Sequence, residues 1–336
     1  MLALRDSLRL KALRLSPGLL LAACGSAGDT APDTGTEGTA GGVDSGTNAS
    51  LRACPGVADC FLLTPAETGL PAGGAGAEVD QVALRPALSS RSELLIFLNG
   101  SGGAPLGPVG DPNHNLYTVA RDEGLHALGV SYRSGRAIGL LCPPSALARD
   151  ACYEPTRLSV LTGVPQTDAA PELADITPDE GVYARVAAAL RTLASGDPDG
   201  GWAAFLDDRE PDAERSIRWD KVLVSGHSQG GGHAALVGKL HAVARVVMLA
   251  SPCDSVAGAP ATWLTRSADY QTAASRFVGL GEASDSVCPA QFAAWDALDM
   301  SASAGDNSAT LCADEDAHSA PVRCVENEPR WRAMLR

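Results

Sequence analysis

A serine enclosed by two glycines is the most reactive arrangement that the sequence offers. Ser228 lies in the run Gly226-His227-Ser228-Gln229-Gly230, after the apolar stretch 222–224 and before a stretch rich in Ala, Gly and Leu. This is the G-x-S-x-G pattern between a strand and a helix, where a tight turn exposes the serine hydroxyl and needs small neighbours. The pattern predicts that Ser228 is a nucleophile, and an ordinary strand-to-helix turn is the alternative.

A glycine-rich loop upstream offers the second chemical element. Asn99-Gly100-Ser101-Gly102-Gly103 follows the apolar run 93–98, and glycines let backbone N–H groups converge on one point. In acyl transfer that point is the oxyanion, so the N–H groups of Gln229 and Ser101 are the expected donors. A phosphate cradle would need a following Lys and Ser or Thr, whereas Ala104-Pro105 follow. A flexible turn is the remaining alternative.

The elements that would position these residues alternate along the chain. Short apolar runs predict strands at 79–84, 93–98, 126–132, 221–225, 245–249, 276–280 and 308–312. Apolar residues at helical spacing predict helices at 112–123, 178–193, 229–240, 289–298 and 329–335. We therefore expect an α/β fold, with a mostly parallel central sheet flanked by helices on both faces. Two long connections, 137–175 and 251–275, are expected near the carboxyl edge of the sheet, where they could wall an active site.

The order of strand, glycine-rich loop, helix, strand and later elbow resembles the α/β-hydrolase fold of serine esterases and lipases. The chain is also similar to a group of alpha/beta hydrolase-like lipoproteins of myxobacteria-type bacteria, over residues 79–335. The matching stretches are 94–103, 138–163 with its cysteine pair, 219–235 and 276–298. The resemblance implies a serine hydrolase that cleaves carboxylic esters through an acyl-enzyme on Ser228, with neither a metal nor an organic cofactor.

The same resemblance implies that the catalytic residues follow one another as Ser, acid and His. Three histidines follow Ser228. His233 lies on the helix that starts at the elbow and should point elsewhere, and His241 ends that helix about three turns away. His318 lies in a polar loop after the last apolar run, so it is the expected general base. A solvent-exposed loop histidine is the alternative.

Three carboxylates could orient this histidine. Glu282 and Asp285 follow the run 276–280, and Asp254 follows the preceding strand. The resemblance favours Asp285, because related sequences carry the acid at this later position and often have a histidine at the position of Glu282. The short side chain of Asp285 also suits a fixed hydrogen bond to an imidazole. Glu282 and Asp254 stay open as alternative acids.

The N-terminus predicts export and lipidation. Basic residues precede a short apolar stretch that ends in Leu21-Ala22-Ala23-Cys24, which resembles the lipobox of bacterial lipoproteins. We expect a signal peptide at 1–23, a lipidated Cys24 with a flexible Gly/Thr/Ala/Asp tether at 24–53, and a catalytic domain at 54–336. The protein would be anchored to the cell envelope, in the periplasm or at the outer membrane or cell surface. No stretch of the sequence reaches the roughly 20 apolar residues of a transmembrane helix.

Nine cysteines point to the same kind of compartment. Setting Cys24 aside leaves an even number, which suits four disulfides in an oxidising compartment. The spacing suggests that neighbours pair: Cys54 with Cys60, Cys142 with Cys152, Cys253 with Cys288, and Cys312 with Cys324. Metal ligation is the weaker alternative, because the chain has no C-x-x-C pair and its histidines are not grouped near cysteines.

Composition limits the classes of partner. The formal net charge of the 336 residues is −14, and so acidic a surface repels nucleic acid. The aspartates at 197–199 lack the spacing of a twelve-residue calcium loop, so no metal site is predicted. We expect a monomer that binds a small-molecule or lipid-like ester and contacts the membrane through Cys24. A polyester depolymerase, a thioesterase, a peptidase and a non-catalytic surface binding protein stay open as alternatives.

Overall fold

The computed structural model describes residues 51–87, 91–106, 115–313 and 315–336. The predicted signal peptide, Cys24 and residues 25–50 of the predicted tether lie outside the described residues. Leu51 packs against the core, and β1 (Arg52–Ala53) pairs with β2 (Cys60–Leu63), so regular structure begins two residues before the predicted domain boundary at Cys54. Within the described ranges, no helix combines the length and the apolar character needed to cross a bilayer.

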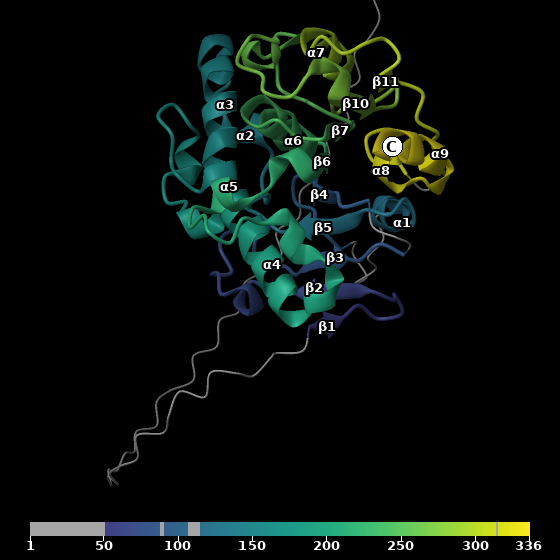
Figure 1. The fold of residues 1–336 in the computed structure, drawn as a ribbon. Coiled ribbons are helices and arrows are strands. Elements are labelled where there is room, and N and C mark those ends of the chain that lie inside the picture. The colour runs from purple at the N-terminus through teal and green to yellow at the C-terminus, as the bar shows by residue number, and fades with distance from the viewer. Residues whose placement is uncertain (1–50, 88–90, 107–114, 314) are drawn as a thin grey trace, which may run out of the picture. The chain divides into compact units, whose positions relative to one another are not determined.

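A nine-stranded sheet forms the centre of the described structure (Figure 1). After β1 and β2 it comprises β3 (Gln81–Leu84), β4 (Leu94–Leu98), β5 (His126–Val130), β6 (Val222–His227), β7 (Arg245–Leu249), β10 (Phe277–Leu280) and β11 (Gly305–Asp306). The order across the sheet is β1-β2-β3-β5-β4-β6-β7-β10-β11. The six strands β5, β4, β6, β7, β10 and β11, in their order across the sheet, run parallel, so the loops that follow β4, β6, β10 and β11 meet at one edge. Strand β3 is antiparallel to both β2 and β5.

The central strands are buried on both faces, which explains their continuous apolar sequence. In β4, Leu94, Ile96 and Leu98 belong to one hydrophobic cluster, whereas Leu95 and Phe97 belong to a second. Successive side chains of a strand point to opposite faces. The two clusters are therefore the two cores on either side of the sheet.

Helices cover each face. One layer comprises α1 (Asn115–Asp122), α8 (Ala320–Arg323) and α9 (Glu328–Leu335), of which α8 and α9 both contact α1. The other layer contains α2 (Ile138–Leu141), α3 (Ala146–Thr162), α4 (Val182–Gly196), α5 (Ala213–Ser216), α6 (Gln229–Leu240) and α7 (Gln291–Ala297). A two-stranded hairpin of β8 (Ser255–Val256) and β9 (Ala259–Pro260) lies in the segment after β7. The predicted α/β architecture with helices on both faces is confirmed (Figure 1).

The prediction of a last strand at 308–312 is wrong. Strand β11 comprises only Gly305–Asp306, and Ser308 forms an isolated bridge with Glu282. Beyond it, the Thr310 N–H donates to Asn327 Oδ1 at 2.8 Å, and Asn327 Nδ2 donates to the Thr310 carbonyl at 3.0 Å. A side-chain amide therefore satisfies the backbone groups that a neighbouring strand would otherwise pair.

Helix α3 was not predicted. The segment 137–175 was expected to be a long connection, but it contains α2 and the 17-residue helix α3. The predicted helix at 112–123 is present as α1 from Asn115, and residues 112–114 lie outside the described residues.

All four predicted disulfides are confirmed. They join Cys54 to Cys60, Cys142 to Cys152, Cys253 to Cys288, and Cys312 to Cys324. The Cys253–Cys288 bond links the loop after β7 to the loop between β10 and α7, and the Cys312–Cys324 bond closes a loop that contains His318. Two of the four disulfides therefore restrain loops at the carboxyl edge of the sheet.

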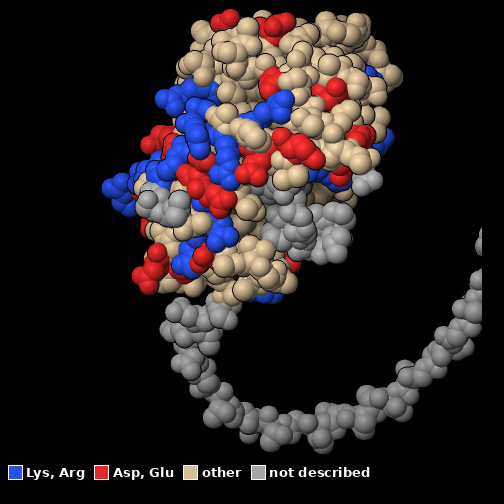
Figure 2. All heavy atoms as spheres, turned by 90° about the vertical axis from the view of Figure 1, so that its right-hand side faces the viewer, with Lys and Arg blue, Asp and Glu red and all other residues tan. Residues whose placement is uncertain are grey.

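Charges of both signs are mixed on the face that carries the C-terminal helices (Figure 2). Glu123, just after α1, accepts hydrogen bonds from Arg332 Nη1 at 3.0 Å and from Arg336 Nε at 2.8 Å. Hydrogen bonds from Arg336 and Arg332 lower the pKa of Glu123 to about 2. These ion pairs fasten α9 to α1, and the net negative charge is not concentrated on this face.

Candidate active site

Ser228 occupies a strained backbone position between β6 and α6. Its φ is 53° and its ψ is −118°, a combination that L-residues rarely adopt. A Cβ on Gly226 would lie 2.2 Å from the Gly230 carbonyl carbon, and a Cβ on Gly230 would lie 2.0 Å from the Leu98 carbonyl oxygen. Only glycine fits at either position. The strand, turn and helix predicted around the serine are therefore present, and Ser228 is partly exposed at the turn.

Asn99 shapes the glycine-rich loop that follows β4. Its buried Nδ2 donates to the carbonyl oxygens of Gly100 at 2.9 Å and Gly103 at 2.8 Å, and it lies 3.1 Å from Ser134 Oγ. The Tyr132 hydroxyl donates to the Asn99 carbonyl at 2.5 Å. These bonds hold the carbonyl groups of Gly100 and Gly103 toward the Asn99 side chain.

The two predicted oxyanion residues contact each other. The Ser101 hydroxyl donates to Gln229 Oε1 at 2.8 Å. Gly102 N–H donates to the Ser134 carbonyl at 2.8 Å and Gly103 N–H to the Gly100 carbonyl at 3.0 Å, whereas the amides of Ser101 and Gln229 have no hydrogen bond among the described residues. Two unpaired N–H groups beside a serine hydroxyl suit an oxyanion that forms there.

Asp285 and His318 form a hydrogen-bonded pair. His318 Nδ1 lies 2.8 Å from Asp285 Oδ2, and the Asp285 side chain has 0% exposure against 12% for His318. The N–H groups of Val287 and Cys288 donate to Asp285 Oδ1 at 2.8 and 3.1 Å, and Gln291 Nε2 donates to Oδ2 at 3.0 Å. Burial acts to raise the pKa of Asp285, but the hydrogen bond from His318 and those from the two backbone amides outweigh it and lower the pKa below its ordinary value. Asp285 is therefore ionised at neutral pH.

The other two candidate acids are bound elsewhere. Glu282 is partly exposed, and its Oε2 accepts hydrogen bonds from the Ser284 hydroxyl and, at 2.6 Å, from the Ser284 N–H. Asp254 is buried, and its two oxygens accept from Arg157 at 2.6 and 2.7 Å. Of the three carboxylates, Asp285 is the one that contacts His318.

His318 is also held through its backbone. His227 Nε2–H donates to the His318 carbonyl at 2.8 Å, and the His318 N–H donates to Asp316 Oδ1 at 2.8 Å. The imidazole of His318 lines the same cavity as Ser228, although among the described residues no hydrogen bond joins the two side chains. Contacts between nucleophile and base are often long in a free enzyme and shorten when substrate binds.

The two remaining downstream histidines lie in other surroundings, as predicted. His233 is fully buried with its ring edge-on to Tyr132, and burial, followed by the nearby charge of Arg157, holds its pKa well below the ordinary value. His241 stacks on Trp219 with ring centroids 4.4 Å apart.

The cavity that contains Ser228 has a volume of about 570 Å³. Its polar lining includes Ser228, His318 and the glycine-rich loop, and its apolar lining includes Phe97, Leu106, Val287 and Val322. Val287 is 66% exposed, so the apolar side opens to solvent. This space suits a ligand with one polar, reactive group and a short apolar part.

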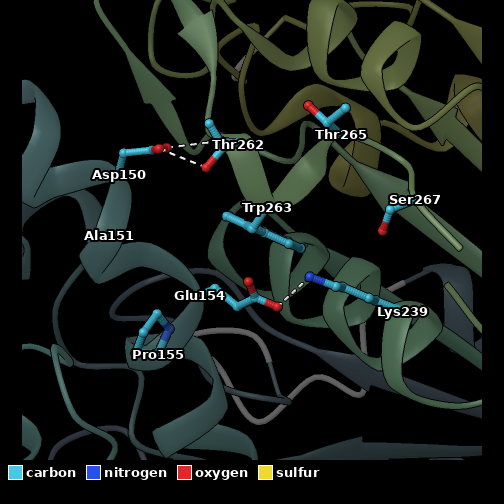
Figure 3. A pocket seen from close by; sticks show the side chains of 9 residues that line it. All are labelled: Asp150, Ala151, Glu154, Pro155, Lys239, Thr262, Trp263, Thr265 and Ser267. Carbon is cyan, nitrogen blue, oxygen red and sulfur yellow. Dashed lines mark hydrogen bonds and ion pairs between the residues drawn. The ribbon is translucent and has the colours of Figure 1, made fainter. Parts of the chain in front are cut away.

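A second cavity of about 430 Å³ lies between α3, α6 and the segment after β9 (Figure 3). Asp150 accepts two hydrogen bonds from Thr262, at 2.9 Å from its N–H and 2.7 Å from its hydroxyl. Lys239 Nζ lies 2.5 Å from Glu154 Oε1. In this cavity Asp150 is thus paired with Thr262 and Glu154 with Lys239.

Grouped side chains that could ligate a metal ion occur once in the described ranges, as Cys312, Cys324 and Glu326. The two cysteines are joined in a disulfide, and their sulfur atoms therefore cannot act as thiolate ligands.

Several residues of the site were missed by sequence reasoning. Gln291 supports Asp285, Tyr132 supports the glycine-rich loop, and Arg157 contacts both Asp254 and the Gln229 carbonyl. Gln291 follows Asp285 within one loop and a helix start, so a search for amides near the acid could have found it. No sequence signal marks Tyr132 or Arg157, because their partners are remote in the chain.

Solved structures of similar arrangement include an alpha-beta serine hydrolase homologue from Coxiella burnetii, 12% identical over 83% of this chain and 95% of that chain, with a TM-score of 0.37. They also include a thermophilic carboxylesterase cloned from a metagenomic library. It is 12% identical over 86% of this chain and 92% of that chain, with a TM-score of 0.40. An α/β serine hydrolase without a lid from Xanthomonas campestris is 11% identical over 83% of this chain and 94% of that chain, with a TM-score of 0.39. No protein-family model and no curated protein matches the chain.

Proposed function

From the α/β-hydrolase fold that the sheet order and the elbow establish, we propose that this protein is a serine hydrolase that cleaves carboxylic esters. The observation that carries the proposal is the 2.8 Å hydrogen bond between His318 and ionised Asp285, at the cavity that also contains strained Ser228. Nucleophile, base and orienting acid occur in the chain order of this fold. The sequence resemblance to lipoproteins of myxobacteria-type bacteria stays a prediction.

The reaction follows from the positions of these groups. His318 Nε2 takes the proton from Ser228 as the serine oxygen attacks the acyl carbon, while the N–H groups of Gln229 and Ser101 bind the oxyanion. His318 returns the proton to the leaving alcohol, which leaves an acyl group on Ser228. It then takes a proton from water as the water attacks that acyl group, and it returns this proton to the Ser228 oxygen as the bond from that oxygen to the acyl carbon breaks and the carboxylic acid leaves. Asp285 keeps the imidazole proton on Nδ1 throughout.

The cavity supports a substrate with a small apolar portion. Leu106, Val287 and Val322 would contact the acyl or the alcohol group, while the mixed lining and the modest volume do not favour a long buried chain. We propose short- to medium-chain esters rather than long-chain lipids. Hydrolysis of p-nitrophenyl esters of increasing acyl length tests this, and a rate that keeps rising to long chains would contradict it.

Covalent labelling tests whether the site is catalytic. A fluorophosphonate probe should label the wild-type protein, because it mimics the tetrahedral intermediate on an activated serine. Ser228→Ala should not be labelled and should lose ester hydrolysis, whereas Ser225→Ala, a buried serine of β6, should keep both. A folded wild-type protein that neither reacts nor turns over esters would instead favour a non-catalytic binding protein.

We also propose that the protein is exported and anchored through lipid on Cys24. The lipobox-like sequence and the four disulfides support this, because disulfides persist in oxidising compartments. Metabolic labelling with palmitate should mark the wild type and not Cys24→Ala. Label that persists in the variant would contradict anchoring at this position.

A further inference from the structure

A buried arginine contacts the helix that starts at the elbow. Arg157 of α3 is 1% exposed. Its Nε and Nη2 donate to the two oxygens of Asp254 at 2.7 and 2.6 Å, and its Nη1 donates to the Gln229 carbonyl at 2.9 Å. Arg157 therefore holds the backbone of the residue whose N–H is the predicted oxyanion donor.

The surroundings of the Arg157 guanidinium are built to fit it. A Cβ on Gly232 would lie 2.4 Å from the guanidinium, so the glycine on α6 makes room for the arginine. The Trp263 indole N–H donates to Asp254 Oδ2 at 2.9 Å, and the guanidinium lies 5.8 Å from the Trp263 ring centre. Both oxygens of Asp254 are thus fixed, and the acid cannot turn away from Arg157.

Burial of such a pair is costly in free energy. Desolvation of two charges commonly cancels their attraction, and well-packed apolar residues of similar volume are often as stable or more so. The pair is therefore a weak source of stability. Its fixed geometry is better explained by what it orients, and the group that it orients in the site is Gln229.

We propose that Arg157, held by Asp254, is a positioning residue for the oxyanion site. It fixes the carbonyl of Gln229 and with it the orientation of the Gln229 residue, so that the N–H faces the cavity. Gln229 Oε1 in turn accepts from the Ser101 hydroxyl, which places the second donor. This inference rests on the proposed hydrolase function. It assigns a part in catalysis to α3, a helix that was not predicted from the sequence.

Arg157→Lys is the first test. A lysine Nζ can stay paired with Asp254, but one nitrogen cannot also reach the Gln229 carbonyl. We expect kcat to fall about 10- to 100-fold, as when an oxyanion donor is weakened, and KM to change by less than about threefold. Because the loss is specific to the transition state, the inhibition constant of a boronic acid that forms a tetrahedral adduct should rise by the same factor as kcat/KM falls.

A double variant, Arg157→Met with Asp254→Asn, removes both charges and leaves no unpaired buried ion. It should show the same loss in kcat and in boronic acid binding. Rates are expressed per serine that a fluorophosphonate labels at completion, so that unfolded protein is not counted.

Arg185 is the matched control. It is also buried, and it donates to the carbonyls of Ala77, Pro71 and Ala72 and to the Ser131 hydroxyl. Arg185→Lys should lower the melting temperature while kcat per labelled serine stays within about twofold of wild type. An active wild type in which Arg157→Lys keeps its kcat and its boronic acid affinity would overturn the positioning role. A wild type without esterase activity would overturn the proposed function instead.

Discussion

Replacement of Asp285 by asparagine separates the charge of the acid from its shape. Oδ1 of Asp285 accepts from two backbone N–H groups, and Oδ2 accepts from His318 Nδ1 and Gln291 Nε2. In Asp285→Asn the carbonyl oxygen must face the two backbone amides, because an NH₂ group there would meet two donors. The asparagine NH₂ therefore faces His318 and Gln291.

This orientation puts the imidazole in the wrong tautomer. An NH₂ group donates to Nδ1, so the imidazole proton moves to Nε2, and a protonated Nε2 cannot take the proton from Ser228. In serine proteases the same exchange lowers kcat about 10⁴-fold, or about 5 kcal/mol of transition-state stabilisation. For Asp285→Asn we expect a loss of about 10³- to 10⁴-fold in kcat with KM within about threefold of wild type.

The assay is hydrolysis of a short p-nitrophenyl ester, with folding checked by circular dichroism. Glu282→Gln is the matched control, since it makes the same change of carboxylate to amide three residues away on a side chain that contacts Ser284. It should keep its activity within about threefold. The reasoning is refuted if Asp285→Asn keeps more than about a tenth of the wild-type kcat, or if Glu282→Gln shows the larger loss.

Two further predictions concern the restraints around the site and the effect of acid. Replacement of Cys253 and Cys288 by serine should lower kcat/KM at least about tenfold, because the Cys288 N–H holds Asp285. The same change at Cys54 and Cys60 should lower the melting temperature and leave kcat/KM within about twofold of wild type. Equal losses of kcat/KM in the two double variants would contradict this prediction. The pKa of Glu123 is lowered from 4.5 to about 2, so below about pH 4.5 the unfolded chain binds more protons than the folded one. The contribution of the Glu123 carboxylate to the free energy of unfolding is therefore fully present above that pH and is lost as the pH falls toward 2. Glu123→Gln should therefore melt about 2–4 °C lower than wild type at pH 6 and at about the same temperature near pH 2. If the difference in melting temperature between wild type and variant does not decrease in acid, the ion pairs of Glu123 with Arg332 and Arg336 are not its cause.

Local signals predicted the sheet and the nucleophile. Apolar runs mark β4 and β6 because these strands are buried on both faces, and the elbow needs glycine at 226 and 230 for reasons of space that any sequence must satisfy. The disulfides were also predictable, because the eight cysteines after Cys24 pair consecutively in chain order. Each of these features leaves a pattern that can be recognised in the sequence without knowledge of the fold.

Features that depend on distant residues were not predictable. The sequence left three carboxylates open, and Asp285 is distinguished by where the loop after β10 places it relative to His318. Helix α3 escaped prediction because Pro155 lies in its interior, where proline usually ends a helix. Arg157 was not identified from the sequence, because its partner Asp254 follows β7, far along the chain.

The late position of the base has a consequence for how the protein is made. Ser228 and its strained turn depend on β4, β6 and α6, which are complete well before the chain reaches His318 and the disulfide of Cys312 and Cys324. A nascent chain would carry Ser228 without the proposed base until residue 318 is synthesised and its loop closes. In the proposed exported esterase, Ser228 would therefore lack its base until the disulfide of this last loop forms in an oxidising compartment.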